Sequence, residues 1–366
     1  MIGAGLVGRA CAWQLLHRGH RVLLVDPLPL DADHGCDPPP DTGSWAALGV
    51  LMAQVFHRSS GRAWRLRQRS LELWGQWRQQ LAERGHPLPW RPGLLLLASS
   101  PDELERQQRL VAERQAMGLP LELWNPQQLE ALAPALPPAA LGGLFSPQDG
   151  QLDPAPVLEA LLRDGLERGL QTCRDSAMRL ERNPTGWTVQ TRGGQALQAE
   201  AVVLCAGVAS ATLLEPLGYE RGLEPVLGQA LELTLAAPSG WADPEAQHWP
   251  GAVAWQGLNL VPRPHNRLWL GATLEPGDRP DPTALASMRN LNGRAPNWLQ
   301  QAKVIRQWQG HRPHPIGRPA PLLEKLEPGL LLASGHYRNG VLLAPATAEW
   351  VANQLEGPDV ERLTKP

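Results

Sequence analysis

The glycines at the start of the chain constrain its fold more than any other feature. Gly3, Gly5 and Gly8, in MIGAGLVG, have the spacing G-x-G-x-x-G. The first glycine of this pattern allows a tight turn, the second lets the backbone approach a pyrophosphate, and the third lets a helix pack on a strand. Residues 6–17 have a helical period, and RVLLVD predicts a strand that ends at Asp26. This order favours a nucleotide-binding turn.

A strand should precede such a turn, but only Met1 and Ile2 do. We expect either that the protein begins a few residues upstream or that the centre of its sheet is weakened. Neighbouring strands would otherwise hold unpaired backbone groups, which cost about 1–3 kcal/mol each when buried. The turn alone does not separate FAD from NAD. The Pro-rich stretch 27–43 and the later strand in AVVLCAGVAS (201–210) favour a large flavin cofactor spread across the domain.

Composition and charge exclude several classes of protein. The 366 residues are 43% hydrophobic, which is enough for a sizeable core, and the formal net charge is −2. This balance argues against nucleic acid or an anionic membrane as a partner. No run of 18 apolar residues and no signal peptide is present, so we expect a cytoplasmic protein without a membrane span. The four cysteines are scattered, which predicts neither disulfides nor a metal site.

The hydrophobic pattern changes from a helical to a two-residue period near residue 187. The helical pattern predicts helices at 62–84, 101–117, 126–132, 154–169, 282–302 and 341–355. The two-residue pattern predicts a hairpin at 187–199 and antiparallel strands at 228–236, 252–262 and 267–274. Short buried strands are expected at 201–205 and 330–333. The fold class that follows is α/β, or α+β overall.

Six segments resemble the FAD-dependent D-amino-acid oxidase family, and within it the glycine oxidases of thiamine biosynthesis. They are GAGLVG (3–8), SWAALGVL (44–51), AVVLCAGVAS (201–210), LVPRPHNRLWLGATLEPGD (260–278), GHRP (310–313) and GHYRNGVLLAPAT (335–347). The resemblance implies a Rossmann-like FAD-binding domain interleaved with an antiparallel-sheet substrate domain. The expected FAD-binding parts are 1–80, 150–225 and 312–366, and the expected substrate-binding parts are 81–149 and 226–311.

The resemblance also implies which residues bind FAD. The first group contains Gly3, Gly5, Leu6, Val7, Gly8, Asp26 and Pro27 for the adenosine and pyrophosphate, with Ala177 beside the adenine. The second contains Gly43, Ser44, Leu48, Gly49 and Val50 for the middle of the cofactor, and Gly207 is a further cofactor-binding residue. The third contains His336, Tyr337, Arg338, Asn339, Gly340, Val341 and Leu342 around the flavin ring. No metal is expected.

Arg312 matches the arginine that holds the substrate carboxylate in this family, and Arg338 matches a second arginine of the substrate pocket. Arginine suits this task because its guanidinium meets a carboxylate with two parallel bonds. The flavin accepts a hydride, so no protein base is obligatory. The expected partners are a small amino acid and O₂, and a homo-oligomer is expected.

The chain departs from the family pattern at the substrate pocket. Asn259 stands where the glycine oxidases often have a tyrosine, and Leu274 where they have a methionine. The leading hypothesis is oxidative deamination of a small amino acid, with glycine favoured, to an imine and hydrogen peroxide for thiazole synthesis. Oxidation or dehydrogenation of sarcosine or D-amino acids stays open as an alternative. A non-catalytic flavin-binding scaffold is the third hypothesis.

Overall fold

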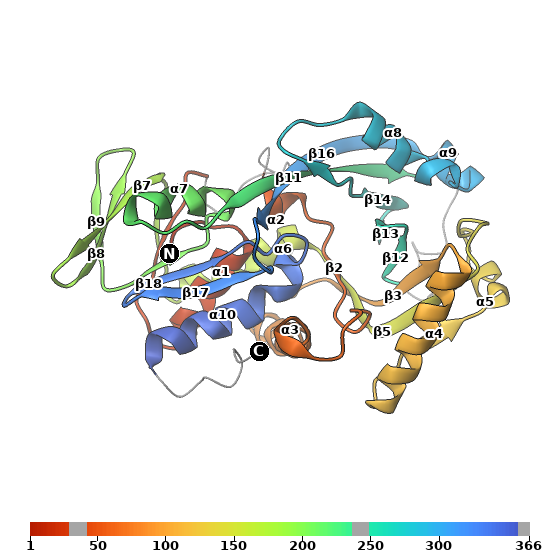
Figure 1. The fold of residues 1–366 in the computed structure, drawn as a ribbon, viewed down its shortest axis with the longest axis horizontal. Coiled ribbons are helices and arrows are strands. Elements are labelled where there is room, and N and C mark those ends of the chain that lie inside the picture. Colours follow the sequence, from red (N-terminus) through yellow and green to blue (C-terminus); the bar gives the residue numbers. More distant parts are fainter. Residues whose placement is uncertain (29–41, 236–248, 358–366) are drawn as a thin grey trace.

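A computed structural model describes residues 1–28, 42–235 and 249–357 of the chain (Figure 1). Its helices are α1 (Leu6–His17), α2 (Gly43–Ala46), α3 (Gly61–Glu83), α4 (Pro101–Ala116), α5 (Pro126–Glu130), α6 (Pro154–Glu167), α7 (Ser210–Leu214), α8 (Pro282–Arg289), α9 (Asn297–Gln301) and α10 (Gly340–Glu356). Short 3₁₀ segments are η1 (Gly207–Ala209), η2 (Glu215–Leu217) and η4 (Leu291–Gly293).

The strands form two sheets and a small meander. They are β1 (Leu23–Val25), β2 (Val50–Leu51), β3 (Trp90–Ala98), β4 (Glu122–Trp124), β5 (Gly142–Leu152), β6 (Gln171–Cys173), β7 (Ala177–Asn183), β8 (Gly186–Thr191), β9 (Ala196–Ala199), β10 (Val202–Leu204), β11 (Leu223–Thr234), β12 (Ala252–Trp255), β13 (Leu258–Arg263), β14 (Arg267–Gly271), β15 (Glu275–Pro276), β16 (Lys303–Pro315), β17 (Leu322–Glu327) and β18 (Leu330–Ser334).

The first sheet contains the glycine turn at its centre. β6 pairs with β1, β10 pairs with β18, both in parallel, and β17 is antiparallel to β18. Ile2 joins the two groups, because it forms parallel bridges with Val25 and Leu204. The Ile2 N–H donates to Val203 O (2.9 Å), and the Cys205 N–H donates to Ile2 O (2.8 Å). The short segment before the turn therefore takes the position of the central strand.

Alternate side chains of this sheet enter two different hydrophobic cores. Val203 and Leu331 pack against helices α1, α3, α6 and α10. Val202 and Leu204 pack against α7 and the β7–β8–β9 meander. Successive side chains of a strand point to opposite faces, which explains the alternation. The sheet is therefore covered by helices on one face and by the meander on the other, and α10 is seen below β17 and β18 in Figure 1.

The second sheet is larger and mixed. Its strand order is β15-β11-β14-β13-β12-β3-β5-β2, and β16 pairs with β11 and β4 with β5. All neighbours are antiparallel except β12 and β3, which are parallel. The strands expected at 228–236, 252–262 and 267–274 do pair antiparallel, but 252–262 forms a hairpin of β12 and β13 and not a single strand. One face is covered by α5, α8 and α9, which contribute Leu129, Met288 and Leu299 to a shared core.

One expected helix is broken. The pattern at 282–302 predicts a single helix, but α8 ends at Arg289 and α9 begins only at Asn297. Asn292 between them has φ +53°, in the left-handed region, and Pro296 precedes α9. Such residues interrupt a helix even when the apolar spacing continues through them.

The described residues do not test two other expectations. The long loop expected at 27–43 lies mostly at residues 29–41, outside the described residues. The division at 1–80, 150–225 and 312–366 against 81–149 and 226–311 stays a prediction. Within the described ranges, no helix has both the length and the apolar character needed to cross a bilayer.

Candidate active site

A cavity of about 1540 Å³ connects the two sheets. Its walls come from the glycine turn, the segment from α2 to β2, the loop after β10, the ends of β11 and β16, and the segment before α10. A typical small-molecule pocket has about 300–1,000 Å³. The cavity is therefore large enough for an extended ligand, with different chemical surroundings along its length.

The glycines of the turn are required by close backbone contacts. Gly3 has φ +98°, and a Cβ there would lie 2.5 Å from Cys205 O. A Cβ on Gly8 would lie 1.8 Å from Gly3 O. Gly5 is the N-cap residue of α1. Because glycine has no side chain, it makes no capping hydrogen bond to the first N–H groups of the helix. The first N–H groups of α1 therefore remain at the cavity, where they and the helix dipole favour a phosphate.

Two side chains fasten the turn to its surroundings. Asp26 follows β1 and accepts hydrogen bonds from the N–H groups of Ala4 (2.6 Å) and Leu28 (2.9 Å). Ser44 in α2 accepts a hydrogen bond from the Leu6 N–H (2.8 Å). Asp26 and Ser44 both line the cavity on either side of the turn. The carboxylate of Asp26 is thus placed beside the position expected for a ribose.

The structure brings most of the predicted cofactor residues to this cavity. Those that line it are Gly3, Gly5, Val7, Asp26, Pro27, Gly43, Ser44, Leu48, Gly49, Val50, Ala177, Gly207, His336, Tyr337, Arg338, Asn339, Gly340 and Val341. Leu6, Gly8 and Leu342 are not among the lining residues. Leu6 and Leu342 are buried in the helical core, so their side chains support the wall rather than form it.

The segment before α10 forms a second helix N-terminus at the cavity. Tyr337 has φ +53°, and its N–H donates to Pro313 O (3.2 Å). The N-cap Asn339 makes no side-chain capping bond, and Gly340 and Val341 line the cavity. Unpaired N–H groups at this end of α10 are suited to a carbonyl or a partly negative ring.

His336 is a neutral structural histidine. It is 4% exposed, and its Nε2 lies 2.8 Å from Thr347 Oγ1. Burial, with a smaller effect of Arg62, lowers the pKa of His336 to about 3. It therefore carries no charge near neutral pH, which agrees with a role in shaping the wall and not with that of a base.

Arg312 lies on β16 and lines the cavity beside the segment before α10, since the carbonyl oxygen of the next residue accepts the Tyr337 N–H. Its Nη1 donates to Leu227 O and to Thr273 O, both at 3.1 Å. Burial lowers the pKa of Arg312 to about 10, and the nearby charge of Arg338 acts in the same direction. Since two backbone carbonyls hold one side of the guanidinium, its other nitrogens are presented to the cavity in a fixed orientation.

A buried polar network lies behind Arg312. The carboxylate of Glu275 accepts hydrogen bonds from Gln229 Nε2 (3.0 Å) and from Thr273 Oγ1. The Glu275 charge raises the pKa of Arg312. Gly228 leaves the space for this arginine, because a Cβ there would lie 2.3 Å from Arg312 Nη2. Sequence reasoning missed Gly228 and Glu275, since only the pairing of β11 with β16 and with β15 brings them to Arg312.

Arg338 and Asn259 are the other two predicted substrate-binding residues. Arg338 is exposed, and its Nη2 lies 3.5 Å from Gly257 O. Asn259 on β13 lines the cavity, and its buried Oδ1 has no hydrogen-bond partner among the described residues. Arg312, Arg338 and Asn259 are therefore brought to one cavity from β16, from the segment before α10 and from β13. Their roles toward a substrate stay predictions.

The loop after β2 forms part of the wall and is held by two buried charges. The carboxylate of Asp149 accepts the N–H groups of Ala53 (2.7 Å), Gln54 (3.0 Å) and Val55 (3.1 Å). Arg114 in α4 donates to the carbonyl oxygens of Gln54, Phe56 and Arg58. Burial raises the pKa of Asp149 to about 6. No motif pointed to this clamp.

Comparison with known proteins decides the family. Residues 1–354 match the family model described as "FAD dependent oxidoreductase". The chain belongs to the FAD-dependent oxidoreductase family. It is 28% identical to a glycine oxidase of Geobacillus kaustophilus over 97% of this chain and 92% of that protein. It is 29% identical to a putative thiamine biosynthesis oxidoreductase ThiO of Rhizobium etli, over 96% of this chain and 94% of that protein.

Solved structures agree with the sequence comparison. The crystal structure of the glycine oxidase from Geobacillus kaustophilus has a TM-score of 0.85 and 27% identity, and covers 98% of this chain and 94% of that chain. The expected family, fold class and cofactor are therefore confirmed. The cavity fits FAD: the turn at Gly3–Gly8 would hold the pyrophosphate, and the N-terminus of α10 would face the flavin ring. The family makes the protein an FAD-dependent oxidoreductase.

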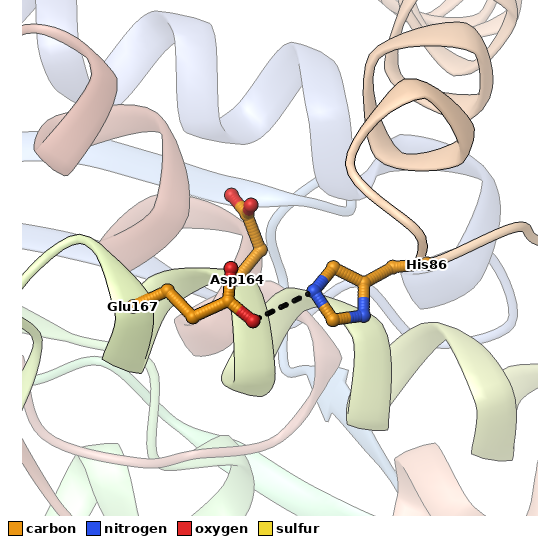
Figure 2. Close-up of side chains that lie close together, drawn as sticks. All are labelled: His86, Asp164 and Glu167. Carbon is orange, nitrogen blue, oxygen red and sulfur yellow. Dashed lines mark hydrogen bonds and ion pairs between the residues drawn. The ribbon is translucent and has the colours of Figure 1, made fainter.

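This oxidoreductase also has a group of metal-ligand residue types away from the cavity. Within the described ranges, atoms of His86, Asp164 and Glu167 lie within 4.8 Å of one another. Figure 2 shows the Asp164 carboxylate turned away from the His86 ring, while Glu167 meets it. Asp164 accepts hydrogen bonds from Arg84, Arg168 (2.8 Å) and Trp13 Nε1 (2.7 Å). Its oxygens are already used by cations, so we interpret the group as an ion-pair network.

Proposed function

We propose that this protein oxidises glycine with FAD and O₂, producing an imine and hydrogen peroxide, and that the imine serves the synthesis of the thiamine thiazole. The observation that carries this proposal is the fixed guanidinium of Arg312, which lines the cofactor cavity together with Arg338. The likeness to glycine oxidases and to a ThiO protein supports both the substrate and the pathway.

The residues of the site would act by binding and orientation. When bound, FAD supplies the electron acceptor for the substrate. Arg312 would hold the amino-acid carboxylate through the nitrogens that Leu227 and Thr273 leave free. This contact orients the Cα–H bond, and such positioning accounts for a large part of catalysis. His336 stays neutral and buried, so we assign no proton transfer to it.

One observation favours a second candidate substrate. The unpaired Oδ1 of Asn259 offers a hydrogen-bond acceptor where the resemblance leads us to expect a tyrosine. The amine of glycine can donate to this oxygen as well, so the hydrogen bond does not separate the substrates. The asparagine side chain is smaller than a phenol and leaves room for a larger amino acid. Oxidation of sarcosine or of a D-amino acid is therefore the alternative. We also propose that the protein works in the cytoplasm and as a homo-oligomer.

A substrate panel with flavin absorbance as the readout tests these assignments. Glycine should bleach the bound flavin under anaerobic conditions and release peroxide in air. Bleaching by sarcosine or D-proline but not by glycine would replace the first candidate with the second. A flavoprotein bleached by no amino acid would favour the non-catalytic scaffold and would contradict both.

A further inference from the structure

Arg67 is a buried arginine of the cavity wall that the proposed function does not use. It lies in α3, is 9% exposed, and lines the cavity. Its Nη1 donates to Ala63 O (3.0 Å), and its guanidinium lies over the ring of Phe56 at 3.9 Å. Its Nε is buried without a hydrogen-bond partner in the described ranges. No described carboxylate pairs with it, in contrast to Arg69 of the same helix, which meets Glu349 at 2.6 Å.

This environment is unfavourable for an unpaired cation. Burial lowers the pKa of Arg67 to about 10. Removing a charge from water is costly unless another charge or enough hydrogen bonds replace the lost hydration. The aromatic face of Phe56 and one carbonyl replace only part of it. A negatively charged or carbonyl oxygen in the cavity would supply the missing partner.

Arg67 occupies a position of its own along the cavity. Arg312 and Arg338 are close enough for one charge to shift the pKa of the other, and Asp26 similarly affects Arg9 near the glycine turn. For Arg67, burial is the cause of the shift. Arg67 reaches the cavity wall from α3, whereas Arg312 lies on β16 and the glycine turn precedes α1. A ligand group that meets α3 is therefore a different partner from a carboxylate held on β16 or a pyrophosphate at the turn.

The support beneath Arg67 is rigid. Phe56 belongs to the loop that Asp149 holds through three N–H groups and Arg114 through three carbonyl oxygens. The backbone that carries the Phe56 ring is therefore held in place, and the ring and the Ala63 carbonyl contact the guanidinium before a ligand arrives. Such preorganisation lowers the entropy cost of binding.

We propose that Arg67 is a third anion-binding residue of the cavity, which donates to a negatively charged oxygen of a bound ligand at a position separate from Arg312 and Arg338. Two sources share this chemistry. One is the pyrimidine part of the flavin ring, which gains negative charge on reduction. The other is a second acidic group on the amino-acid substrate, and only this source rests on the proposed function.

The test compares the holoproteins of wild type, Arg67→Met, Arg67→Lys and a matched control, Arg78→Met. Arg78 also lies in α3, over the Trp90 ring (5.0 Å) and with an unpaired Nε, but does not line the cavity. The first arm measures sulfite binding to the oxidised flavin without any substrate. The second measures kcat/KM for D-aspartate and iminodiacetate relative to glycine.

If the flavin supplies the negatively charged oxygen, Arg67→Met should raise the sulfite Kd about tenfold or more. Arg67→Lys, which keeps the positive charge, should retain most of the wild-type sulfite affinity. With an acidic substrate group as the source, the kcat/KM ratio should fall by a similar factor. Arg78→Met should change neither. Loss of FAD from Arg67→Met alone would also support a charge contact with the cofactor.

The proposal is overturned if Arg67→Met keeps FAD and matches wild type in both arms. It is equally overturned if both Arg67 variants are unfolded by circular dichroism, since the role is then structural. If glycine fails to bleach the wild-type flavin while the sulfite arm still depends on Arg67, the proposed function fails and this inference stands.

Discussion

At the scale of single residues, the site is built from charged side chains whose partners are mostly backbone atoms. Arg312 is held by two carbonyl oxygens, Arg114 by three, and Asp149 by three N–H groups. Backbone partners cannot swing away as side chains do, so these charges stay where the fold puts them. The ligand-facing nitrogens of Arg312 are oriented for the same reason.

Replacing Arg312 with alanine should raise the KM for the amino-acid substrate about tenfold or more. The physical reason is the loss of a charge-assisted contact with the carboxylate, which is worth about 1.5–3 kcal/mol. Steady-state kinetics with oxygen consumption measures it. Arg318→Ala, which removes an exposed arginine paired with Glu324 (3.4 Å), is the control and should leave the KM unchanged. An unaltered KM in Arg312→Ala would reject the assignment.

At the scale of elements, two helix N-termini face one cavity. α1 presents the glycine turn to it and α10 presents Gly340 and Val341. The helices also pack on each other beneath the first sheet, through a core that includes Ala10 and Ala348. Small residues at this contact let the helices approach closely, so the spacing of the two N-termini follows from the packing between them.

Gly8→Ala should weaken FAD binding strongly, whereas Gly75→Ala should not. Both glycines are helical, but a Cβ on Gly8 would meet Gly3 O at 1.8 Å, while Gly75 in α3 has open space around it. The substitution at Gly8 must therefore displace the turn. Titration of the apoproteins with FAD would show a Kd raised about tenfold or more for Gly8→Ala. Gly75→Ala should gain up to about 1 kcal/mol of helix stability, and equal FAD affinity in both variants would contradict the turn geometry.

At the scale of the whole molecule, buried charges connect strands of the second sheet to distant loops and helices. Asp149 at the end of β5 and Arg114 in α4 clamp the loop that leads from β2 to α3. Arg263 on β13 lies 3.2 Å from Asp153 and donates to Leu48 O at 3.3 Å. These contacts hold β5 and β13 of the second sheet to the segments around β2, to α4 and to the start of α6. The free energy of unfolding therefore depends on the ionisation of these side chains.

The free energy of unfolding should depend on pH through Asp149. Burial raises the pKa of Asp149 to about 6, while the unfolded chain has the ordinary value near 4. Between these values the folded chain binds a proton that the unfolded chain releases. The stability contributed by Asp149 is therefore complete below about pH 4 and decreases as the pH rises to about 6, by up to about 3 kcal/mol.

Urea unfolding of wild type and Asp149→Asn from pH 4 to 7 measures this dependence. The difference between the two free energies should change by the stated amount over the window, because the asparagine does not titrate. The exposed Glu200 provides a control, as Glu200→Gln should show no comparable change. A difference that is independent of pH would mean that folding leaves the pKa of Asp149 unchanged.

The sequence by itself determined the nucleotide turn, the family and part of each sheet, namely β1, β10 and β18 in the first and β11 and β14 in the second. Gly3 and Gly8 are diagnostic because their reasons are local: a positive φ and a contact across five residues. The helices at 62–84 and 154–169 were predicted for a similar reason, since the period of their apolar residues requires only neighbouring turns. The break at Asn292 was missed because apolar spacing carries no information on left-handed backbone.

Only the tertiary structure decided which residues surround Arg312 and Arg67 in the cavity. Gly228, Thr273 and Glu275 surround Arg312 through the pairing of β11 with β16 and β15, across 37 to 84 residues of chain. Asp149 and Arg114 meet the loop after β2 from two distant elements. Long-range pairing of this kind depends on how whole sheets pack. The short segment before the turn likewise became a central strand only because β1 and β10 lie on both sides of it.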